Sequence, residues 1–464
     1  MITRRALLAS LTAPLAAQTR KPNIVLIVSD DHHWQCLSAA GNPNISTPNL
    51  DRLAQRGVLF QNAIISSSQC APSRGILLSG LECYQNGLDS NGHITFRFFR
   101  GATVVEQLRR AGYETNLVGK WHIEPTPKEC GFTKAPIWLE PAATAYLNPP
   151  LRHGLDATAD TDTPGHITEI FTQHAVNVIR QARQPYLLWL TYNAPHTPWT
   201  ASEQYRKLYE GKNASLAPPN HPKPQPSRQP TALKGTKKKG GAAMVRPDGR
   251  FDWETYYAVI SELDANIGKV IEAIEASGQW NNTLILFFGD NGFLCGAKGL
   301  QGKVHPWESS LRIPFIASGG LVKRPAKSSA MAASVDVPAT VLDYAGIRSS
   351  HPLAGLSLRS AINGAAFPRD ASFSAWNDGR VEALFAGFSV EPYRAVRTAT
   401  HKLILWESGK QAFFDLRTDP FEEKDLAADP AHAAALRSIQ DRLRARMKAT
   451  ADPAAGWFRP TPAG

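Results

Sequence analysis

The sequence predicts an α/β fold in which a large mixed, mostly parallel sheet is sandwiched by helices and followed by a smaller C-terminal antiparallel sheet plus helix. Three observations indicate this fold. Long apolar runs, typical of strands buried on both faces, recur along the chain. Segments with helical periodicity and clear ends lie between these runs. After about residue 347 the apolar runs become short and are separated by turns.

Five segments carry the aliphatic runs that predict strands of the main sheet. The run at 23–29 is nearly unbroken, the run at 113–119 is strand-like, and acidic or basic side chains follow most of the runs directly. Sites in open α/β sheets lie at the carboxyl ends of the strands, so we expect one site at this edge of the sheet. The predicted strands are residues 23–29, 113–119, 185–192, 283–289 and 311–318.

Helices are predicted where apolar residues recur at helical spacing between clear end signals. One such segment begins with Thr47 as N-cap and Pro48 in the first helical position, and it ends at Gly57. Another helix starts around Pro72, directly after Cys70. Further predicted helices are residues 103–112, 252–277 and 430–447.

Composition divides the chain of 464 residues into several parts. With 43% hydrophobic residues it can bury a sizeable core, so a folded protein is expected rather than a disordered one. We expect a signal peptide at residues 1–17, a catalytic α/β domain at 18–346 and a C-terminal α+β subdomain at 347–464. Within the catalytic domain, a Pro- and Lys-rich insertion at about 211–250 is predicted to be a surface loop.

The N-terminus has the features of an export signal. Arg4 and Arg5 precede a short apolar run that ends in the small residues Ala16 and Ala17. The segment resembles a twin-arginine signal, while the general secretory route stays open as an alternative. No later segment is long and apolar enough for a membrane span. We therefore expect an exported protein, periplasmic or extracellular.

The net charge of +11 narrows the class of partner. A basic protein suits nucleic acid, anionic polysaccharides or sulfate esters. Export argues against nucleic acid, so we expect an anionic ester or polymer. The five cysteines include no C-x-x-C pair and no zinc pattern. Apart from Cys70 they leave zero to two disulfides open: Cys36, Cys83, Cys130 and Cys295.

Residues of two chemical kinds lie directly after predicted strands or in the segments around Cys70 and Lys303. Hard oxygen ligands suit Ca²⁺ or Mg²⁺ rather than zinc, and the adjacent acids Asp30 and Asp31 repel each other unless a cation lies between them. Cationic and imidazole side chains beside such a metal stabilise negative charge on a transferring group. The residues alone therefore predict hydrolysis or transfer at an anionic ester. They are Asp30, Asp31, Cys70, Arg74, Lys120, His122, His196, Asp290, Asn291 and Lys303.

The run Cys70-Ala71-Pro72-Ser73-Arg74 resembles the signature of the sulfatase family, although a buried structural cysteine is the alternative for Cys70 considered alone. The resemblance covers nearly the whole mature chain. Where the family usually continues Leu-Thr-Gly-Arg or -Lys, this chain has Leu78-Ser79-Gly80-Leu81. The other matching segments are Asp30-Asp31, Gly119–His122, Ala194–His196, Gly289–Gly292, Lys303, Trp307–Pro314, Val335–Asp343 and Phe414–Pro420.

The resemblance implies an alkaline-phosphatase-like fold and a formylglycine-dependent sulfuric ester hydrolase. Cys70 would be oxidised to Cα-formylglycine by a formylglycine-generating enzyme, and a hydroxyl of its hydrate would attack sulfur. One divalent metal, Ca²⁺ or Mg²⁺, would be held by Asp30, Asp31, residue 70, Asp290 and Asn291. Asp290 would help to deprotonate the nucleophile. Arg74 and Lys120 would hold the formylglycine oxygens, Lys303 the sulfate oxygens, His196 the leaving alcohol, and His122 would accept the proton of the second hydroxyl.

Two other functions are weighed against this one. The first is a phosphonate or phosphate ester hydrolase of the same superfamily, for which we would expect Asp-His in place of Asp290-Asn291. The second is an inactive polysaccharide-binding module, which the intact set of metal and cationic residues disfavours. For a sulfatase, export and positive charge favour a sulfated carbohydrate over small aryl or alkyl sulfates. The candidate substrate-binding residues are His93, Trp199 and His305.

Overall fold

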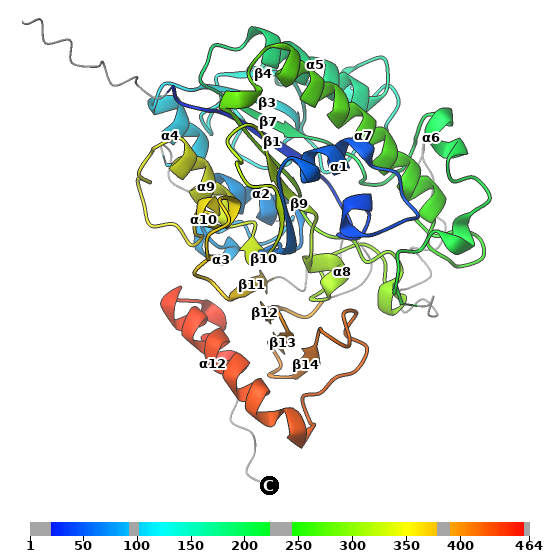
Figure 1. Ribbon diagram of the computed structural model, residues 1–464, viewed down its shortest axis with the longest axis vertical. Helices are drawn as coiled ribbons and strands as arrows, with labels where there is room; N and C mark the ends of the chain where they lie inside the picture. Colours follow the sequence, from blue (N-terminus) through cyan, green and yellow to red (C-terminus); the bar gives the residue numbers. More distant parts are fainter. Residues whose placement is uncertain (1–19, 92–101, 223–243, 378–389, 459–464) are drawn as a thin grey trace, which may run out of the picture.

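A computed structural model describes residues 20–91, 102–222, 244–377 and 390–458 (Figure 1). The predicted signal peptide and the middle of the Pro- and Lys-rich insertion lie outside these ranges. The described residues form an eight-stranded sheet with helices on both faces and a separate four-stranded sheet at the other end of the molecule. The predicted fold class is confirmed.

In the large sheet β9 runs antiparallel to both of its neighbours, and the other seven strands run in one direction. In spatial order the strands are β10 (Ala326–Ala333), β2 (Val58–Ile64), β9 (Phe315–Ser318), β8 (Thr283–Gly289), β1 (Asn23–Ser29), β7 (Tyr186–Thr191), β3 (Glu114–Lys120) and β4 (Lys134–Leu139).

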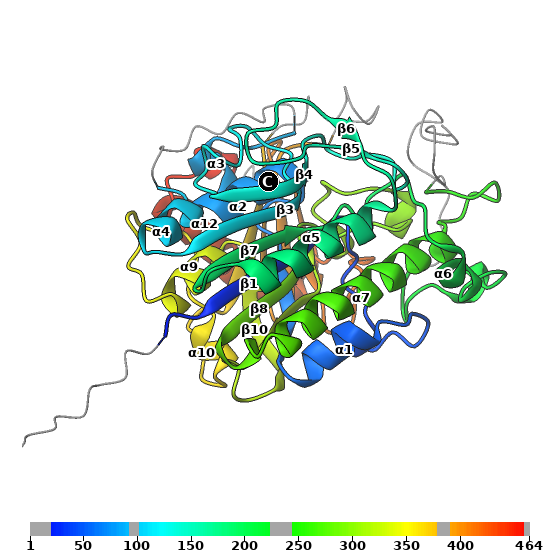
Figure 2. The same cartoon turned by 90° about the horizontal axis from the view of Figure 1, so that it is seen from above.

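Successive side chains of the central strands point to opposite faces of this sheet and so supply core residues on both faces. Ile24 and Leu26 of β1 belong to one buried cluster, and Val25 and Ile27 belong to another. Because both faces are covered by helices, a continuous apolar run is required. Figure 2 shows the layer of α1 (Pro48–Gln55), α5 (Ile167–Gln181) and α7 (Trp253–Ala276). The opposite layer consists of α2 (Cys70–Ser79), α3 (Cys83–Asn86), α4 (Val104–Arg110), α9 (Asp336–Tyr344) and α10 (Arg359–Ile362).

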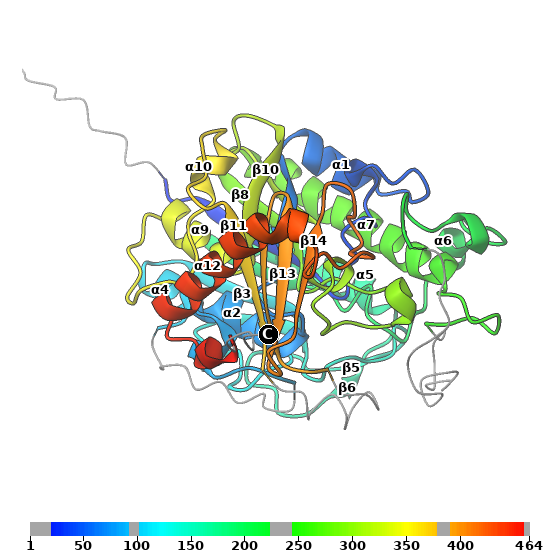
Figure 3. The same cartoon turned by 90° about the horizontal axis from the view of Figure 1, so that it is seen from below.

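The C-terminal part is an antiparallel meander with one long helix on its outer face (Figure 3). The helix packs Ile439 and Leu443 against Leu403 and Phe413, while Tyr393 on the other face joins the core of the large sheet. The elements are β11 (Ala371–Trp376), β12 (Tyr393–Thr398), β13 (His401–Trp406), β14 (Gln411–Asp415) and α12 (Ala433–Ala449).

Shorter elements complete the described chain. None of the helices in the described ranges combines the length and apolar character that a membrane span requires. The shorter elements are β5 (Pro150–Leu151), β6 (Thr161–Asp162), α6 (Glu203–Lys207) and α8 (Glu308–Leu311).

Three sequence-based predictions about these elements need correction. Residues 311–318 do not form one strand, because α8 occupies Glu308–Leu311 and β9 begins only at Phe315, after Pro314. The side chain of Thr47 does not cap α1; Asp264 of α7 instead accepts hydrogen bonds from the backbone N–H groups of Asn49 and Leu50. The strands β2, β4, β10 and β11 were not predicted, because their residues include many polar or small side chains.

Candidate active site

The predicted site residues meet at the carboxyl edge of four adjacent strands, β8, β1, β7 and β3. Asp290 and Asn291 follow β8, Asp30 and Asp31 follow β1, and Lys120 ends β3. His196 lies on the loop after β7. The register is parallel throughout, so these four ends lie side by side. The structure therefore explains why residues distant in sequence share one site.

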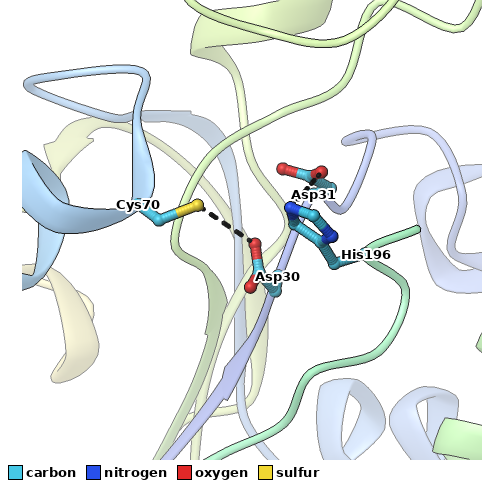
Figure 4. Close-up of side chains that lie close together, drawn as sticks. All are labelled: Asp30, Asp31, Cys70 and His196. Carbon is cyan, nitrogen blue, oxygen red and sulfur yellow. Dashed lines mark hydrogen bonds and ion pairs between the residues drawn. The ribbon is translucent and has the colours of Figure 1, made fainter. Parts of the chain in front are cut away.

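Cys70 is the first residue of α2 and is buried beside these strand ends. Its Sγ lies 3.5 Å from Oδ1 of Asp30 and 2.7 Å from Nζ of Lys303. Figure 4 shows the sulfur directed toward Asp30, with the ring of His196 beside Asp31. A helix N-terminus favours negative charge near its free N–H groups. The side chain of Cys70 points from the start of α2 toward Asp30 at the end of β1.

Two further cations bridge the strand ends from below the surface. Arg74, one turn into α2, donates from Nη2 to Asp290 at 2.9 Å and from Nη1 to the carbonyl of Lys120 at 2.7 Å. Lys120 is fully buried and forms an ion pair with Oδ2 of Asp30. These contacts hold the ends of β1, β3 and β8 together. They also balance part of the negative charge of the carboxylates.

Asp31 is held by groups from two other segments. Lys303 pairs with its Oδ1, and Asn291 donates from Nδ2 to the same oxygen at 2.6 Å. Nδ2 of Asn291 also donates to the carbonyl of Gly292 at 2.8 Å, which orients the amide so that Oδ1 is left to accept. The backbone of Asp31 is left-handed, with φ 64°. This conformation turns the chain so that both acids face the same centre.

The residues fit a hard divalent cation. Asp30, Asp31, Cys70 and His196 offer ligand atoms that all lie within 4.8 Å of one another. Oδ1 of Asp290 and Oδ1 of Asn291 are buried and have no hydrogen-bond partner among the described residues. A buried oxygen without a donor is costly unless an ion or another donor binds it. Oxygen-rich donors of this kind suit Ca²⁺ or Mg²⁺.

The pKa values of the Asp30 and Asp290 carboxyl groups are shifted in opposite directions. Burial favours the neutral form of Asp30, but Lys120 and the other nearby cations outweigh it and hold its pKa well below the usual range. Burial and the charge of Asp30 raise the pKa of Asp290 to about 7. Burial, followed by the charge of Asp30, raises the pKa of the Cys70 thiol to about 12. An unmodified Cys70 is therefore a thiol at neutral pH and a poor nucleophile.

The two histidines differ in how they are held. His196 lies with Nε2 3.7 Å from Oδ2 of Asp31, and its Nδ1 is 2.6 Å from the carbonyl of Thr197. Burial lowers the pKa of His196, and burial and then Lys120 lower the pKa of His122 well below its usual value. Both shifts favour the neutral imidazole. His122 has a left-handed backbone, φ 61°, just beyond the end of β3 at Lys120.

Several residues that support the site carried no signal in the sequence. Tyr256 of α7 donates its hydroxyl to the carbonyl of Asp31 at 2.5 Å and accepts from the N–H of His33 at 2.9 Å. Tyr146 donates to the carbonyl of His196 at 2.8 Å. Both tyrosines are buried and lie far along the chain from the residues they hold. No local pattern marks them, because their role depends on packing alone.

The predicted substrate-binding residues fare differently. Trp199 is buried among Phe251, Tyr256 and Phe293, and its indole N–H donates to the carbonyl of Pro195 at 2.6 Å. It therefore stabilises the loop of His196 and presents no face to a sugar, which corrects the prediction. His305 is half-buried near Lys303, and burial lowers its pKa to about 4. His93 lies outside the described residues.

The cysteines also have an answer in the structure. All five are described, all are buried and none forms a disulfide. Of the zero to two disulfides that the sequence leaves open, the structure therefore contains none.

Comparison with known families identifies the chain. A family model described as Sulfatase matches residues 22–347, more than half of the chain. The chain belongs to the sulfatase family. A second model, described as N-sulphoglucosamine sulphohydrolase, C-terminal, matches residues 296–449 of this sulfatase. The predicted family and enzyme class are confirmed.

Known relatives match this sulfatase over most of its length. An N-acetylglucosamine-6-O-sulfatase of Bacteroides thetaiotaomicron is 25% identical, over 95% of this chain and 89% of the relative. The structure of BT4656 in complex with its substrate D-glucosamine-2-N,6-O-disulfate has a TM-score of 0.78 at 22% identity, covering 94% and 100% of the two chains. A phosphonate monoester hydrolase of Agrobacterium radiobacter has a TM-score of 0.74 at 20% identity, covering 92% and 96%.

Proposed function

We propose that this sulfatase removes sulfate from a sulfated carbohydrate and that its nucleophile derives from Cys70. One observation carries the proposal. The side chain of residue 70 lies at a helix N-terminus between Asp30 and Lys303, inside the group of atoms that fits a divalent cation. A cysteine there has a pKa of about 12, so an unmodified thiol would serve poorly.

Oxidation of Cys70 to Cα-formylglycine would supply, as the aldehyde hydrate, a hydroxyl nucleophile and a second hydroxyl whose ionisation releases sulfate. A bound Ca²⁺ or Mg²⁺, held by Asp30, Asp31, residue 70, Asp290 and Asn291, would supply positive charge for the attacking oxygen and the sulfate oxygens. Asp290, with its pKa near 7, is suited to accept the proton of the nucleophile.

Residues around this centre have distinct roles in the proposal. Arg74 and Lys120 fix the acids and hold the oxygens of residue 70. Lys303, whose Nζ lies 2.7 Å from Cys70 Sγ, holds a sulfate oxygen. His196 hydrogen-bonds or protonates the leaving alcohol, and His122 takes the proton of the second hydroxyl. Since burial favours the neutral imidazole in both residues, either can accept a proton.

The charge balance supports an anionic substrate. Asp30, Asp31 and Asp290 carry at most three negative charges, and Arg74, Lys120 and Lys303 carry three positive charges in the same buried cluster. A divalent cation would therefore leave the site with a net positive charge. A buried positive site attracts an anionic ester strongly.

The carbohydrate class is supported by what the relatives are named for. The N-acetylglucosamine-6-O-sulfatase and the complex with D-glucosamine-2-N,6-O-disulfate both concern sulfated glucosamine. We therefore propose a sulfated amino sugar as the first substrate to test. The phosphonate hydrolase with a TM-score of 0.74 keeps a phosphonate or phosphate ester as the second candidate.

The modification can be read directly by mass spectrometry. Trypsin releases residues 57–74, since Arg56 and Arg74 flank a stretch without other basic residues. After coexpression with a formylglycine-generating enzyme, we expect this peptide to be about 18 Da lighter than the cysteine form. An active preparation that contains only the unmodified thiol would overturn the proposed nucleophile.

Activity is tested on the same preparation with 4-nitrophenyl sulfate, 4-nitrophenyl phosphate and glucosamine 6-sulfate. We expect sulfate release, loss of turnover in Cys70→Ala and in the presence of a chelator, and recovery when Ca²⁺ or Mg²⁺ is restored. Cys83→Ala removes another buried cysteine and serves as the control with activity retained. Faster cleavage of the phosphate ester than of either sulfate would favour the second candidate.

We also propose that residues 1–17 are removed during export and that the catalytic domain extends to about residue 346. The Sulfatase match at residues 22–347 starts after the first segment and ends near that boundary. N-terminal sequencing of the protein secreted by its natural host tests the first point. An intact Met1 on the exported protein would contradict it.

A further inference from the structure

The backbone beside Lys303 is strained. Val304 has φ 80°, and among the described non-glycine residues with positive φ it is the one with a β-branched side chain. A β-branched residue rarely adopts this conformation, and such strain persists only where the surrounding structure imposes it. The surroundings of Val304 therefore need an explanation.

Hydrogen bonds on both sides hold Val304 in this conformation. Its N–H donates to Ser68, to the carbonyl oxygen at 3.1 Å and to Oγ at 3.3 Å. Its carbonyl accepts from the hydroxyl of Tyr393 at 2.8 Å. Ser68 lies two residues before Cys70, whereas Tyr393 is the first residue of β12 in the C-terminal sheet. The strained residue thus links the loop of residue 70 to a separate part of the molecule.

We propose that Tyr393 is a positioning residue, whose hydroxyl keeps Val304 left-handed and thereby fixes Nζ of Lys303 beside residue 70. The hydroxyl of Tyr393 is buried and touches no charged group of the site, so it acts through the backbone of the loop. The catalytic consequence rests on the proposed function of Lys303. The positional consequence rests on the contacts alone.

A second attachment of the same loop supports this reading. Glu308, five residues after Lys303, accepts from Arg397 at 3.1 Å and from Lys402 at 3.2 Å, both on the C-terminal sheet. The N–H of Glu308 donates to Glu422 at 2.7 Å. The C-terminal sheet therefore fastens residues 303–308 at both ends. Of these attachments, only the Tyr393 hydroxyl can be removed without leaving a buried charge.

The test is Tyr393→Phe, compared with Tyr192→Phe. Tyr192 is equally buried, and its hydroxyl lies 2.8 Å from Oγ1 of Thr172, away from the loop of Lys303. With 4-nitrophenyl sulfate we expect kcat of Tyr393→Phe to fall about tenfold or more, since small misplacement of a catalytic group is costly. We expect Tyr192→Phe to keep the parental kcat. Equal kcat in Tyr393→Phe and the parent would overturn the proposal.

A double-mutant cycle separates positioning from general destabilisation. If Tyr393 acts through Lys303, then Tyr393→Phe causes little further loss of kcat in a Lys303→Ala background. Val304→Gly adopts a positive φ without strain, so it should unfold at the same or higher denaturant concentration and recover kcat when combined with Tyr393→Phe. Fully additive losses in the cycle would contradict the proposal.

Hydrogen exchange gives a readout that needs no turnover. We expect the peptide that contains Val304 to exchange at least tenfold faster in Tyr393→Phe than in the parent. In Tyr192→Phe its exchange rate should equal that of the parent. If the parent enzyme cleaves no sulfate ester, the proposed function fails while this measurement still decides the positional claim. Unchanged exchange in Tyr393→Phe would overturn the positional claim itself.

Discussion

Tyr256 supports Asp31, one of the proposed metal ligands, through a hydrogen bond to its backbone carbonyl. Its hydroxyl donates to the carbonyl of Asp31, the residue whose left-handed backbone turns both acids toward one centre. We predict that Tyr256→Phe lowers affinity for Ca²⁺ about tenfold, because groups that orient metal ligands usually contribute at this level. Calcium titration followed by calorimetry measures the change.

The neighbouring residue provides the control for that prediction. The hydroxyl of Tyr257 accepts from Asn42 at 2.8 Å and does not contact Asp31. Tyr257→Phe should therefore keep the parental calcium affinity. Equal losses in both variants would mean that the effect comes from α7 as a whole.

At the scale of elements, Gly119 allows β3 to approach β7 closely. Its φ is 106°, and a Cβ there would lie 1.9 Å from the carbonyl oxygen of Thr191. We predict that Gly119→Ala lowers the free energy of unfolding by roughly 3 kcal/mol or more and displaces Lys120. Gly112 also has a positive φ, 90°, but no atom lies within 4 Å of its Cβ position. Gly112→Ala should cost only about 1 kcal/mol, as measured by urea unfolding.

Asp264 connects α7 to the start of α1 and gives a pH prediction. Burial, partly offset by the bonds from Leu50 and Asn49, raises its pKa from 3.8 to about 6. The folded state thus binds this proton more tightly than the unfolded chain, so the stability linked to Asp264 falls as pH rises from about 4 to 6. The change amounts to roughly 3 kcal/mol at 1.36 kcal/mol per unit.

Asp264→Asn removes this titration and tests the sign. We predict that the stability advantage of the parent over Asp264→Asn is larger at pH 4 than at pH 7, as urea unfolding at a series of pH values would show. Parallel stability curves for the two proteins would contradict the prediction.

At the scale of the whole molecule, a buried ionic cluster joins helix α8 to the C-terminal sheet. Lys402 is fully buried between Glu308 at 3.2 Å and Glu422 at 2.7 Å. We predict that Lys402→Met lowers the free energy of unfolding by about 3–5 kcal/mol, because it leaves two buried carboxylates short of a cation. Arg442→Gln removes an exposed pair with Asp370 and should cost less than about 1 kcal/mol. Equal losses in the free energy of unfolding for the two substitutions, measured with urea, would contradict a stabilising role of the cluster.

Local patterns were sufficient for much of the fold and for the chemistry of the site. Apolar periodicity and end signals predict the strands β1 and β8 and the helix α7 to within a few residues of their observed bounds. The acids after β1 and the run around Cys70 are contiguous, so their residue types alone indicated an anionic ester and a hard cation. These features can be predicted because they depend on residues that are neighbours along the chain.

The remaining features depend on contacts between distant parts of the chain. The strand β10, rich in Ala and Ser, is a strand because β2 pairs with it. The indole of Trp199 is buried by residues more than fifty positions away, and Tyr256 and Tyr393 reach the site from distant segments. Residue types and local motifs therefore predict which groups form the candidate site. Packing decided how they are held, because contacts between distant residues depend on the assembled sheet and leave no periodic signal along the chain.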